Sequence, residues 1–391
     1  MANAARILVL GTADWNQPIA TNQHYMTREL AEAYDVEFVE SLGLRRPEFN
    51  ARDLRRIGRR LMGSAGRTEG YRATPRRVRV ISPNVIPIHT LPWSAINKAV
   101  LRRQVGAWAR FAGPRVFWTY SPVTYGLESA AHASVYHCVD LYGKYPGIDS
   151  KLIDNAERKL ASSATVAIGS SDIVVKHLRQ QGFKNVLHWE NVADVARIIG
   201  PSAPPECETR HGAIFAGNLS PKKVDFDLLR QIVDAGMELH LAGPIAEGGG
   251  ESNRQVLDLV SAGATYHGLL DLDDLSALMR RCRVGLIPYQ LTPYTEGVSP
   301  LKTFEYLAAG LSVVSTRLPG VTPRDQDVFV ESSPADVVAR VSEQLVVDAS
   351  SRIPNRLATA ARHSWSQRGA DARGLVATRI TDVQGPQTNL R

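Results

Sequence analysis

The sequence of 391 residues predicts an α/β protein of two domains, each built on a parallel sheet. Two observations favour this fold: short apolar runs alternate with helical patterns in two separate series, and a cluster of Pro and Gly at residues 199–205 lies between them. The length also suits two domains that each bury a core. We therefore expect a first domain over 1–198, a linker over 199–210, a second domain over 211–362, and a closing helix and tail over 363–391.

The first series begins with an apolar strand at residues 6–10, followed by a loop over 11–18 and a helical pattern over 22–34. Short β-branched and aromatic runs predict the remaining strands at 36–39, 78–81, 116–120, 134–139, 165–168 and 185–189. Apolar periodicity predicts further helices over 94–111, 148–161 and 171–181. The order is that of a parallel α/β domain.

The second series repeats this order after the linker. Its predicted strands are 212–215, 238–242, 265–266, 284–287 and 311–316, with a loop over 216–223 and a helix over 225–235. Ligands of open parallel sheets bind beside the carboxyl ends of the strands. Two such domains are therefore expected to face each other across a ligand-binding cleft.

The segment between residues 299 and 316 is the most informative part of the sequence. Ser299 suits the N-cap of a helix, Pro300 suits its first position, and Gly310 suits a left-handed residue just beyond its end. Lys302 and Glu305 are three residues apart and so share one face. The pattern predicts a short, well-bounded helix with a cation and a carboxylate side by side.

This helix has the chemistry of a nucleotide-sugar site. Its first N–H groups and the positive end of its dipole suit a diphosphate, and Lys302 would add positive charge. Glu305 could accept hydrogen bonds from a ribose diol. The alternative is an ordinary helix in which Lys302 and Glu305 form a solvated ion pair.

The segment, with the following loop of Leu318, Pro319 and Gly320, resembles the C-terminal-domain signature of GT-B glycosyltransferases. It is most similar to the branch that makes bacterial cell-surface polysaccharides, including the teichuronic-acid-type transferases. The resemblance implies two Rossmann-like domains facing a cleft, and a terminal helix over 363–379 that crosses back to the first domain. Relatives often carry two Glu residues seven apart, but here Gly297 occupies the first of those positions. The resemblance therefore extends to Glu305 and not to the neighbouring Glu296.

The resemblance also implies a set of donor-binding residues in the second domain. The usual Arg of the first loop is replaced by Asn218, so Lys222 or Lys223 is expected to meet the diphosphate unless the two are a plain surface pair. The nucleobase is expected beside Tyr289, and the approach to the helix beside Glu296. The complete predicted set is Gly217, Asn218, Lys222, Lys223, Gly243, Tyr289, Glu296, Ser299, Pro300, Leu301, Lys302 and Glu305.

Transfer of a sugar also needs a base for the acceptor hydroxyl, expected in the first domain. Asp140 follows the strand at 134–139, where catalytic groups gather, and is the leading candidate against a purely structural carboxylate. His24 and His89 are the alternatives because histidine titrates near neutrality. The fold that the resemblance implies neutralises the diphosphate with helix ends and cations, so we expect neither a metal nor another cofactor.

Positive charge is concentrated in one region. The chain carries +7 overall, whereas residues 45–115 hold sixteen Arg and one Lys against three acidic residues, a net +14. Within it, residues 52–61 have the pattern of a basic amphipathic helix of the kind that lies on anionic lipid. A solvated helix or an Arg-rich loop is the alternative. Nucleic acid is an unlikely partner because no recognisable nucleic-acid-binding motif accompanies the charge.

Other features bear on the compartment. No apolar run approaches the ~18–20 residues that span a bilayer, and the first apolar run is too short for a signal peptide. The three cysteines are widely spaced, which indicates neither a disulfide framework nor a zinc site. We expect a cytoplasmic protein that binds peripherally to the inner face of the plasma membrane.

The preferred hypothesis is a metal-independent glycosyltransferase that uses a UDP- or GDP-linked sugar to extend a glycan or a polyprenyl-linked acceptor of the cell envelope. One alternative is a nicotinamide-dependent oxidoreductase, although Gly11 and Gly217 each lack the partners of a dinucleotide-binding Gly-x-Gly-x-x-Gly motif. The other is an inactive scaffold of the same fold that binds membrane or nucleic acid.

Overall fold

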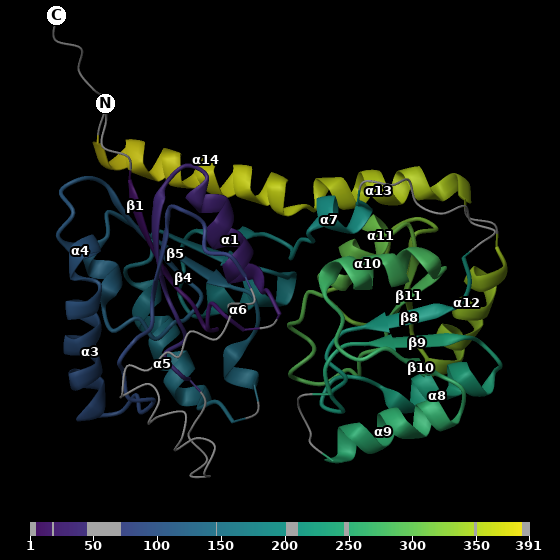
Figure 1. Ribbon diagram of the computed structural model, residues 1–391. Coiled ribbons are helices and arrows are strands. Elements are labelled where there is room, and N and C mark those ends of the chain that lie inside the picture. Colours follow the sequence, from purple (N-terminus) through teal and green to yellow (C-terminus); the bar gives the residue numbers. More distant parts are fainter. Residues whose placement is uncertain are drawn as a thin grey trace, which may run out of the picture. The chain divides into compact units, whose positions relative to one another are not determined.

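The computed structural model describes residues 5–17, 19–44, 72–145, 147–200, 210–245, 250–347 and 350–384. The chain divides into two compact units. The first unit contains the chain up to Trp189 and the residues from Arg368 on, and the second is Glu190–Gln367. Each unit has its own parallel sheet flanked by helices (Figure 1), which confirms the α/β prediction.

The first sheet has seven strands in the order β3-β2-β1-β4-β5-β6-β7, and every neighbouring pair is parallel. The strands are β1 Arg6–Leu10, β2 Asp35–Val39, β3 Val78–Ile81, β4 Arg115–Thr119, β5 Ala133–Cys138, β6 Val166–Gly169 and β7 Val186–His188. All seven lie within two residues of their predicted positions. The order reverses between β1 and β4, so the loops after these strands diverge, and ligands of open parallel sheets bind at such a point.

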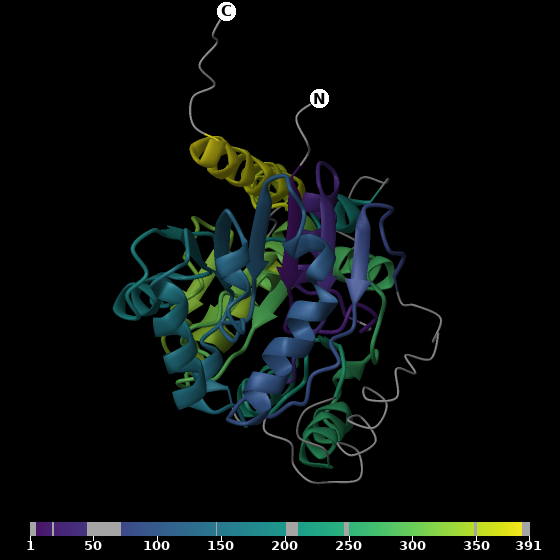
Figure 2. The same ribbon diagram turned by 90° about the vertical axis from the view of Figure 1, so that its left-hand side faces the viewer.

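Helices cover both faces of this sheet. They are α1 Asn22–Ala31, α3 Trp93–Gln104, α4 Gly106–Ala109, α5 Ser150–Ala161 and α6 Asp172–Gln180, with the 3₁₀ turns η1 Leu127–Ala130 and η2 Tyr142–Lys144. Figure 2 shows α3 lying along the sheet. Leu101 of α3 and Trp108 of α4 belong to one buried cluster with Leu8 of β1. The predicted single helix over 94–111 is wrong, because the chain leaves helical geometry at Val105 (ψ 14°). This break lets the Trp108 indole N–H reach the carbonyl of Arg6 at 3.2 Å.

The second sheet has six parallel strands in the order β10-β9-β8-β11-β12-β13. They are β8 Ala213–Ala216, β9 Leu239–Ala242, β10 Thr265–Tyr266, β11 Val284–Ile287, β12 Ser312–Thr316 and β13 Val328–Glu331. The edge strand β13 was not predicted.

The helices of the second unit form two layers, one on each face of the sheet (Figure 1). One layer contains α7 Val195–Ile199, α10 Leu272–Arg281, α11 Lys302–Ala308 and α13 Ile353–Arg362, and the other contains α8 Phe226–Asp234, α9 Gly250–Ser261 and α12 Pro334–Val346. The short 3₁₀ turn η4 Ser350–Arg352 precedes α13.

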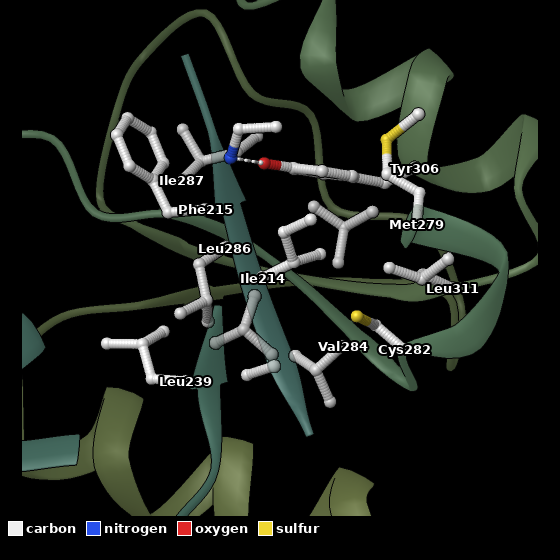
Figure 3. Packing of buried hydrophobic residues seen from close by; sticks show 14 of the residues in the cluster. Ile214, Phe215, Leu239, Met279, Cys282, Val284, Leu286, Ile287, Tyr306 and Leu311 are labelled. Carbon is white, nitrogen blue, oxygen red and sulfur yellow. Dashed lines mark hydrogen bonds between the residues drawn. The ribbon is translucent and has the colours of Figure 1, made fainter. Parts of the chain in front are cut away.

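Tyr306 of α11 fixes this helix to the sheet (Figure 3). Its ring is fully buried, and its hydroxyl accepts a hydrogen bond of 2.9 Å from the Ala216 amide at the end of β8. A Cβ atom on Gly285 of β11 would lie 2.2 Å from the Tyr306 ring, so this strand position must be glycine. The contact sets the distance between α11 and the loop that follows β8.

The last helix, α14, is Trp365–Gln384, longer at its carboxyl end than the predicted helix over 363–379. Its residues from Arg368 on group with the first unit, where the Arg373 guanidinium lies 3.0 Å from the Glu29 carboxylate. The predicted basic helix over 52–61 falls outside the residues that the structure describes. None of the helices among the described residues is both long and apolar enough to cross a bilayer.

Candidate functional site

The two predicted glycine loops meet at the carboxyl ends of β8 and β9. The Gly217 amide donates to the carbonyl of Ala242 at 2.8 Å. Gly243 has φ 138°, and a Cβ atom built on it would lie 1.9 Å from the carbonyl oxygen of Gly217. The absence of a side chain at Gly243 is therefore required by contact between the two loops.

Asn218, which follows Gly217, presents an unused acceptor in this region. Its side-chain Oδ1 is buried and has no hydrogen-bond partner among the described residues. A buried acceptor without a partner costs free energy, so it is a natural contact for a ligand donor.

Lys302 and Glu305 form an ion pair at the start of α11, as their spacing predicted. The Lys302 ammonium donates to the Glu305 carboxylate, and the two side chains are only 19% and 11% exposed. The ion pair that the alternative expected is therefore present, but it is largely buried and not solvated. A partly buried pair is stronger than an exposed one and holds both groups in a fixed geometry.

The predicted N-cap is wrong. Helix α11 begins at Lys302 with Leu301 as its N-cap, and no side chain caps it. The chain instead makes a tight turn in which the Thr303 amide donates to the carbonyl of Pro300 at 3.2 Å. Ser299 is nearly buried, and its own carbonyl accepts a hydrogen bond of 2.7 Å from the Asn191 side-chain amide.

The end of α11 confirms the prediction at Gly310. This residue has φ 82°, its amide donates to Leu307, and the amide of Leu311 donates to Tyr306. This pair of bonds is a Schellman motif. Arg210 also donates to the carbonyl of Ala309, which places a cation at the negative end of the helix.

The structure separates the two candidate lysines. The ammonium of Lys223 lies 5.3 Å from the centre of the Tyr289 ring, within cation–π range, whereas Lys222 is exposed. The backbone pairs the two segments as well, since Val224 and Tyr289 form an antiparallel bridge. Lys223 therefore lies beside the residue predicted to flank the nucleobase.

Glu296 lies on the exposed side of a tight turn built around the buried Thr295. Behind this turn, a Cβ atom on Gly320 would lie 2.1 Å from the carbonyl of Val298. The Leu318-Pro319-Gly320 loop is thus packed against the segment leading into Ser299.

Three Asp-x-Asp triplets occur in this unit, at 225–227, 271–273 and 325–327. Asp225 and Asp271 accept from backbone amides as N-caps of α8 and α10. Asp327 bonds the guanidinium groups of Arg352 and Arg356. In each triplet, one carboxylate therefore has a structural role: Asp225, Asp271 or Asp327.

In the first unit, Asp140 follows β5 and is half-buried. The hydroxyl of Tyr145 donates to its Oδ2 at 2.9 Å. The neighbouring Tyr142 hydroxyl lies 3.5 Å from the hydroxyl of Thr12 in the loop after β1. Asp140 therefore lies just beyond the carboxyl end of β5, in the same segment as Tyr142, which reaches the loop after β1.

The two alternative histidines are held by internal hydrogen bonds. In the buried His24, Nδ1 accepts from the Thr21 amide at 3.0 Å and Nε2 donates to the carbonyl of Asp14 at 3.1 Å. Burial and the nearby Arg72 lower the pKa of His24 to about 4. In His89 one nitrogen contacts the Tyr125 hydroxyl and the other the carbonyl of Gly43, and burial lowers its pKa. Both ring nitrogens of each histidine are therefore engaged in internal contacts, and Asp140 stays the leading prediction for the base.

Several residues at these sites were not predicted. His137 of β5 is buried against the Tyr120 ring at 4.9 Å, and burial lowers its pKa to about 3, so it stays neutral. His363 stacks on Phe304 of α11 at 4.0 Å and contacts the carboxylate of Glu190 at 3.2 Å. Their partners come from distant parts of the chain, so no local sequence pattern marks them.

Comparison with known proteins gives a consistent result. Residues 210–346 match the family model for group 1 glycosyl transferases. A protein named as a teichuronic acid biosynthesis glycosyltransferase, TuaH of Bacillus subtilis (strain 168), is 27% identical over 233 residues. That match spans 54% of this chain and 58% of the relative.

Solved structures share the fold over almost the whole chain. Sucrose-phosphate synthase from Thermosynechococcus elongatus has a TM-score of 0.68 at 15% identity and covers 95% of this chain and 99% of its own. Alr3699/HepE of Anabaena, solved in complex with UDP, has a TM-score of 0.66 at 13% identity and covers 96% and 100%. At these identities the likeness shows the fold, which is that of the GT-B transferases.

Proposed function

Because residues 210–346 form a group 1 glycosyl transferase domain within a GT-B fold, we propose that this protein transfers a sugar from a nucleoside diphosphate donor, UDP- or GDP-linked. The acceptor is a glycan or a lipid-linked intermediate of the cell envelope. The TuaH resemblance supports the envelope as the setting, and the UDP complex of the Anabaena neighbour supports a uridine nucleotide. These relatives give no support to the nicotinamide-dependent alternative.

The observation that carries the proposal is the partly buried Lys302–Glu305 pair within the matched region. Lys302 supplies a cation for the diphosphate, and Glu305 an acceptor for the ribose hydroxyls. Lys223 beside Tyr289 adds a second cation, and the Oδ1 of Asn218, which has no hydrogen-bond partner within the described part of the chain, adds a second acceptor. The proposed donor set thus comes from side chains in the loops after β8 and β11 and from the first turn of α11.

In the reaction, the acceptor oxygen forms a bond to the anomeric carbon while the bond from that carbon to the diphosphate breaks. The acceptor hydroxyl loses its proton, for which we propose Asp140 as base. The Tyr145 hydroxyl holds the Asp140 side chain in position. We propose that the cationic side chains stabilise the departing diphosphate without a metal ion.

A thermal-shift panel of UDP-, GDP- and dTDP-sugars tests the donor. A ligand at 100 times its Kd stabilises the native state by about 2.7 kcal/mol, which raises the Tm of a unit of this size by roughly 5–10 °C. Lys302→Met and Glu305→Gln should abolish the shift. Asp234→Asn is the matched control, because it breaks an exposed Arg230–Asp234 pair on α8. No shift with any donor would refute the proposal.

A second experiment tests the base. Asp140→Asn should bind the donor normally but transfer sugar at least about 100-fold more slowly. Full transfer by this variant would refute only the assignment of Asp140.

We further propose that α3 docks on anionic lipid, which would bring the protein to a lipid-linked acceptor. The start of α3 exposes large apolar side chains, with Leu91 79%, Trp93 39% and Ile96 46% accessible. Lys98, Arg102 and Arg103 lie exposed further along the same helix. Apolar anchors next to exposed cations suit the interface of an anionic bilayer.

Sedimentation with vesicles tests this docking. Binding is expected to vesicles containing phosphatidylglycerol and to be weak on pure phosphatidylcholine. Trp93→Ala and the double variant Arg102→Ala/Arg103→Ala should each reduce it, whereas Leu291→Ala, which removes a side chain 60% exposed in the second unit, should not. If the wild type and all three variants bind the vesicles equally, α3 is not the docking helix.

A further inference from the structure

Three histidines and a glutamate gather on the β8, β9 and β10 side of the second sheet. His211 Nδ1 lies 2.6 Å from Glu238 Oε2, and His240 Nε2 lies 3.1 Å from Glu238 Oε1. On the other side of its ring, His240 Nδ1 lies 3.2 Å from His267 Nε2. The ligand atoms of His211, Glu238 and His240 all lie within 4.8 Å of one another.

The backbone positions of these residues are set by the sheet. Glu238 directly precedes β9 and His240 lies within it, so their side chains share one face of the strand. The Ala213 amide donates to the carbonyl of Glu238 at 2.9 Å, and the His267 amide donates to Leu241 at 2.9 Å. His240 is therefore part of the sheet, and Glu238 is held directly at its edge by the bond to Ala213.

Gly212 brings His211 to this place. Its φ of +72° is left-handed, and a Cβ atom on it would lie 3.2 Å from the side chain and carbonyl of Glu238. A larger residue would be strained and crowded there. The glycine thus turns the chain so that His211 meets the carboxylate.

The chemistry of the cluster suits a metal ion. Two imidazole nitrogens and a carboxylate oxygen are a preferred donor set for Zn²⁺. When His240 donates its Nδ1–H to His267, its Nε2 lone pair points toward Glu238. Such a partner on the second nitrogen is the usual way in which a zinc-ligating histidine is oriented. The side chains of His211 and Glu238 are 55% and 45% exposed, so an ion can enter from solvent.

We propose that His211, Glu238 and His240 bind Zn²⁺, with water completing a tetrahedral site and His267 positioning His240. Tetrahedral ligands of Zn²⁺ lie about 3.3 Å apart. The His211–Glu238 contact of 2.6 Å must therefore widen, and ligand atoms up to 4.8 Å apart must draw together, which the half-exposed His211 can allow by moving. Two of the ligands precede β8 and β9, at the end opposite Gly217 and Gly243. The ion therefore has a structural role, and the proposal stands apart from the proposed transferase activity.

Zinc titration of untagged, EDTA-treated protein tests the proposal, with calorimetry for affinity and metal analysis for stoichiometry. The wild type should bind one Zn²⁺ per chain with a rise in Tm. His240→Ala and Glu238→Gln should lower the affinity by at least about 100-fold, and His267→Ala by about 10- to 100-fold. His188→Ala is the control, because His188 lies on the first unit, where its half-exposed side chain contacts Asp172 at 3.2 Å.

Two outcomes would overturn the proposal. One is the lack of saturable binding by the wild type. The other is unchanged affinity in His240→Ala and in His211→Ala, whose half-exposed side chain can be removed with little risk to folding. Circular dichroism in EDTA shows whether each variant is folded before zinc is added.

Discussion

Replacing Gly243 with Ala would test whether the contact between the two glycine loops organises the donor region. The added Cβ atom would lie 1.9 Å from the Gly217 carbonyl oxygen, which is a backbone atom and cannot rotate away. One of the two loops must therefore move. Because both loops follow strands of the same sheet, the movement would displace the neighbouring Asn218.

The size of the effect follows from two terms. Alanine at φ 138° costs about 1–3 kcal/mol in backbone strain, and the forced shift costs about 1–3 kcal/mol more. At about 2–4 °C per kcal/mol for a unit of this size, the Tm should fall by roughly 5–20 °C. Donor affinity should fall as well, because the loop that holds Asn218 is displaced.

Gly236→Ala is the matched control for this prediction. Gly236 also has a left-handed φ of 77°, but no atom lies within 4 Å of its Cβ position. It should therefore lose only about 1–2 kcal/mol from backbone strain and keep its donor affinity. Thermal unfolding followed by circular dichroism measures both variants. If they lose the same stability and both still bind donor normally, the loop contact has no special importance.

Two further predictions concern other residues. Asn191→Ala removes the 2.7 Å hydrogen bond to the Ser299 carbonyl and should weaken donor binding by about 3- to 10-fold. Asn185→Ala removes a similar hydrogen bond to the Thr165 carbonyl in the first unit and should leave donor binding unchanged. Calorimetry with donor measures the affinity of both variants. The pKa of His24 is 6.5 when unfolded and about 4 when folded, so the unfolded state binds more protons between these values. The free energy of unfolding should therefore be highest above pH 6.5 and fall by up to about 3 kcal/mol toward pH 4. Urea unfolding at a series of pH values should show a smaller fall for His24→Asn than for the wild type. An equal fall in both proteins would refute the lowered pKa of His24.

The sequence was sufficient to predict most strands because each lies in a short apolar run between turn residues. It was insufficient where tertiary contacts decide the boundary. The helix over 94–111 is continuous in its apolar pattern, and only the packing of Trp108 reveals the break at Val105. The edge strand β13 is half-exposed, and its apolar run is only the three residues Val328 to Val330.

In the candidate site, too, the features set by local sequence were predicted and those set by tertiary contacts were not. The pairing of Lys302 with Glu305 follows from helical spacing and was predicted, and so was the left-handed Gly310. The roles of Asn191 and Tyr306 depend on partners 108 and 90 residues away, which no local pattern contains. The zinc-type cluster was missed for the same reason, since strand pairing and not sequence spacing brings His211 to His240.

The hydrogen bonds of the loops also indicate how a donor diphosphate must be held. The amides of Gly217, Leu219 and Gly243 donate to the carbonyls of Ala242, Pro244 and Gly268, so these three cannot also bind phosphate. The Thr303 and Phe304 amides at the start of α11 are used as well. These five amides are therefore not available to a phosphate, and Lys302 is a cation that Glu305 holds in this region. If the proposed donor binds here, we expect it to exchange this ion pair for two contacts with ligand, Lys302 to the diphosphate and Glu305 to the ribose, so that either single substitution should weaken donor binding.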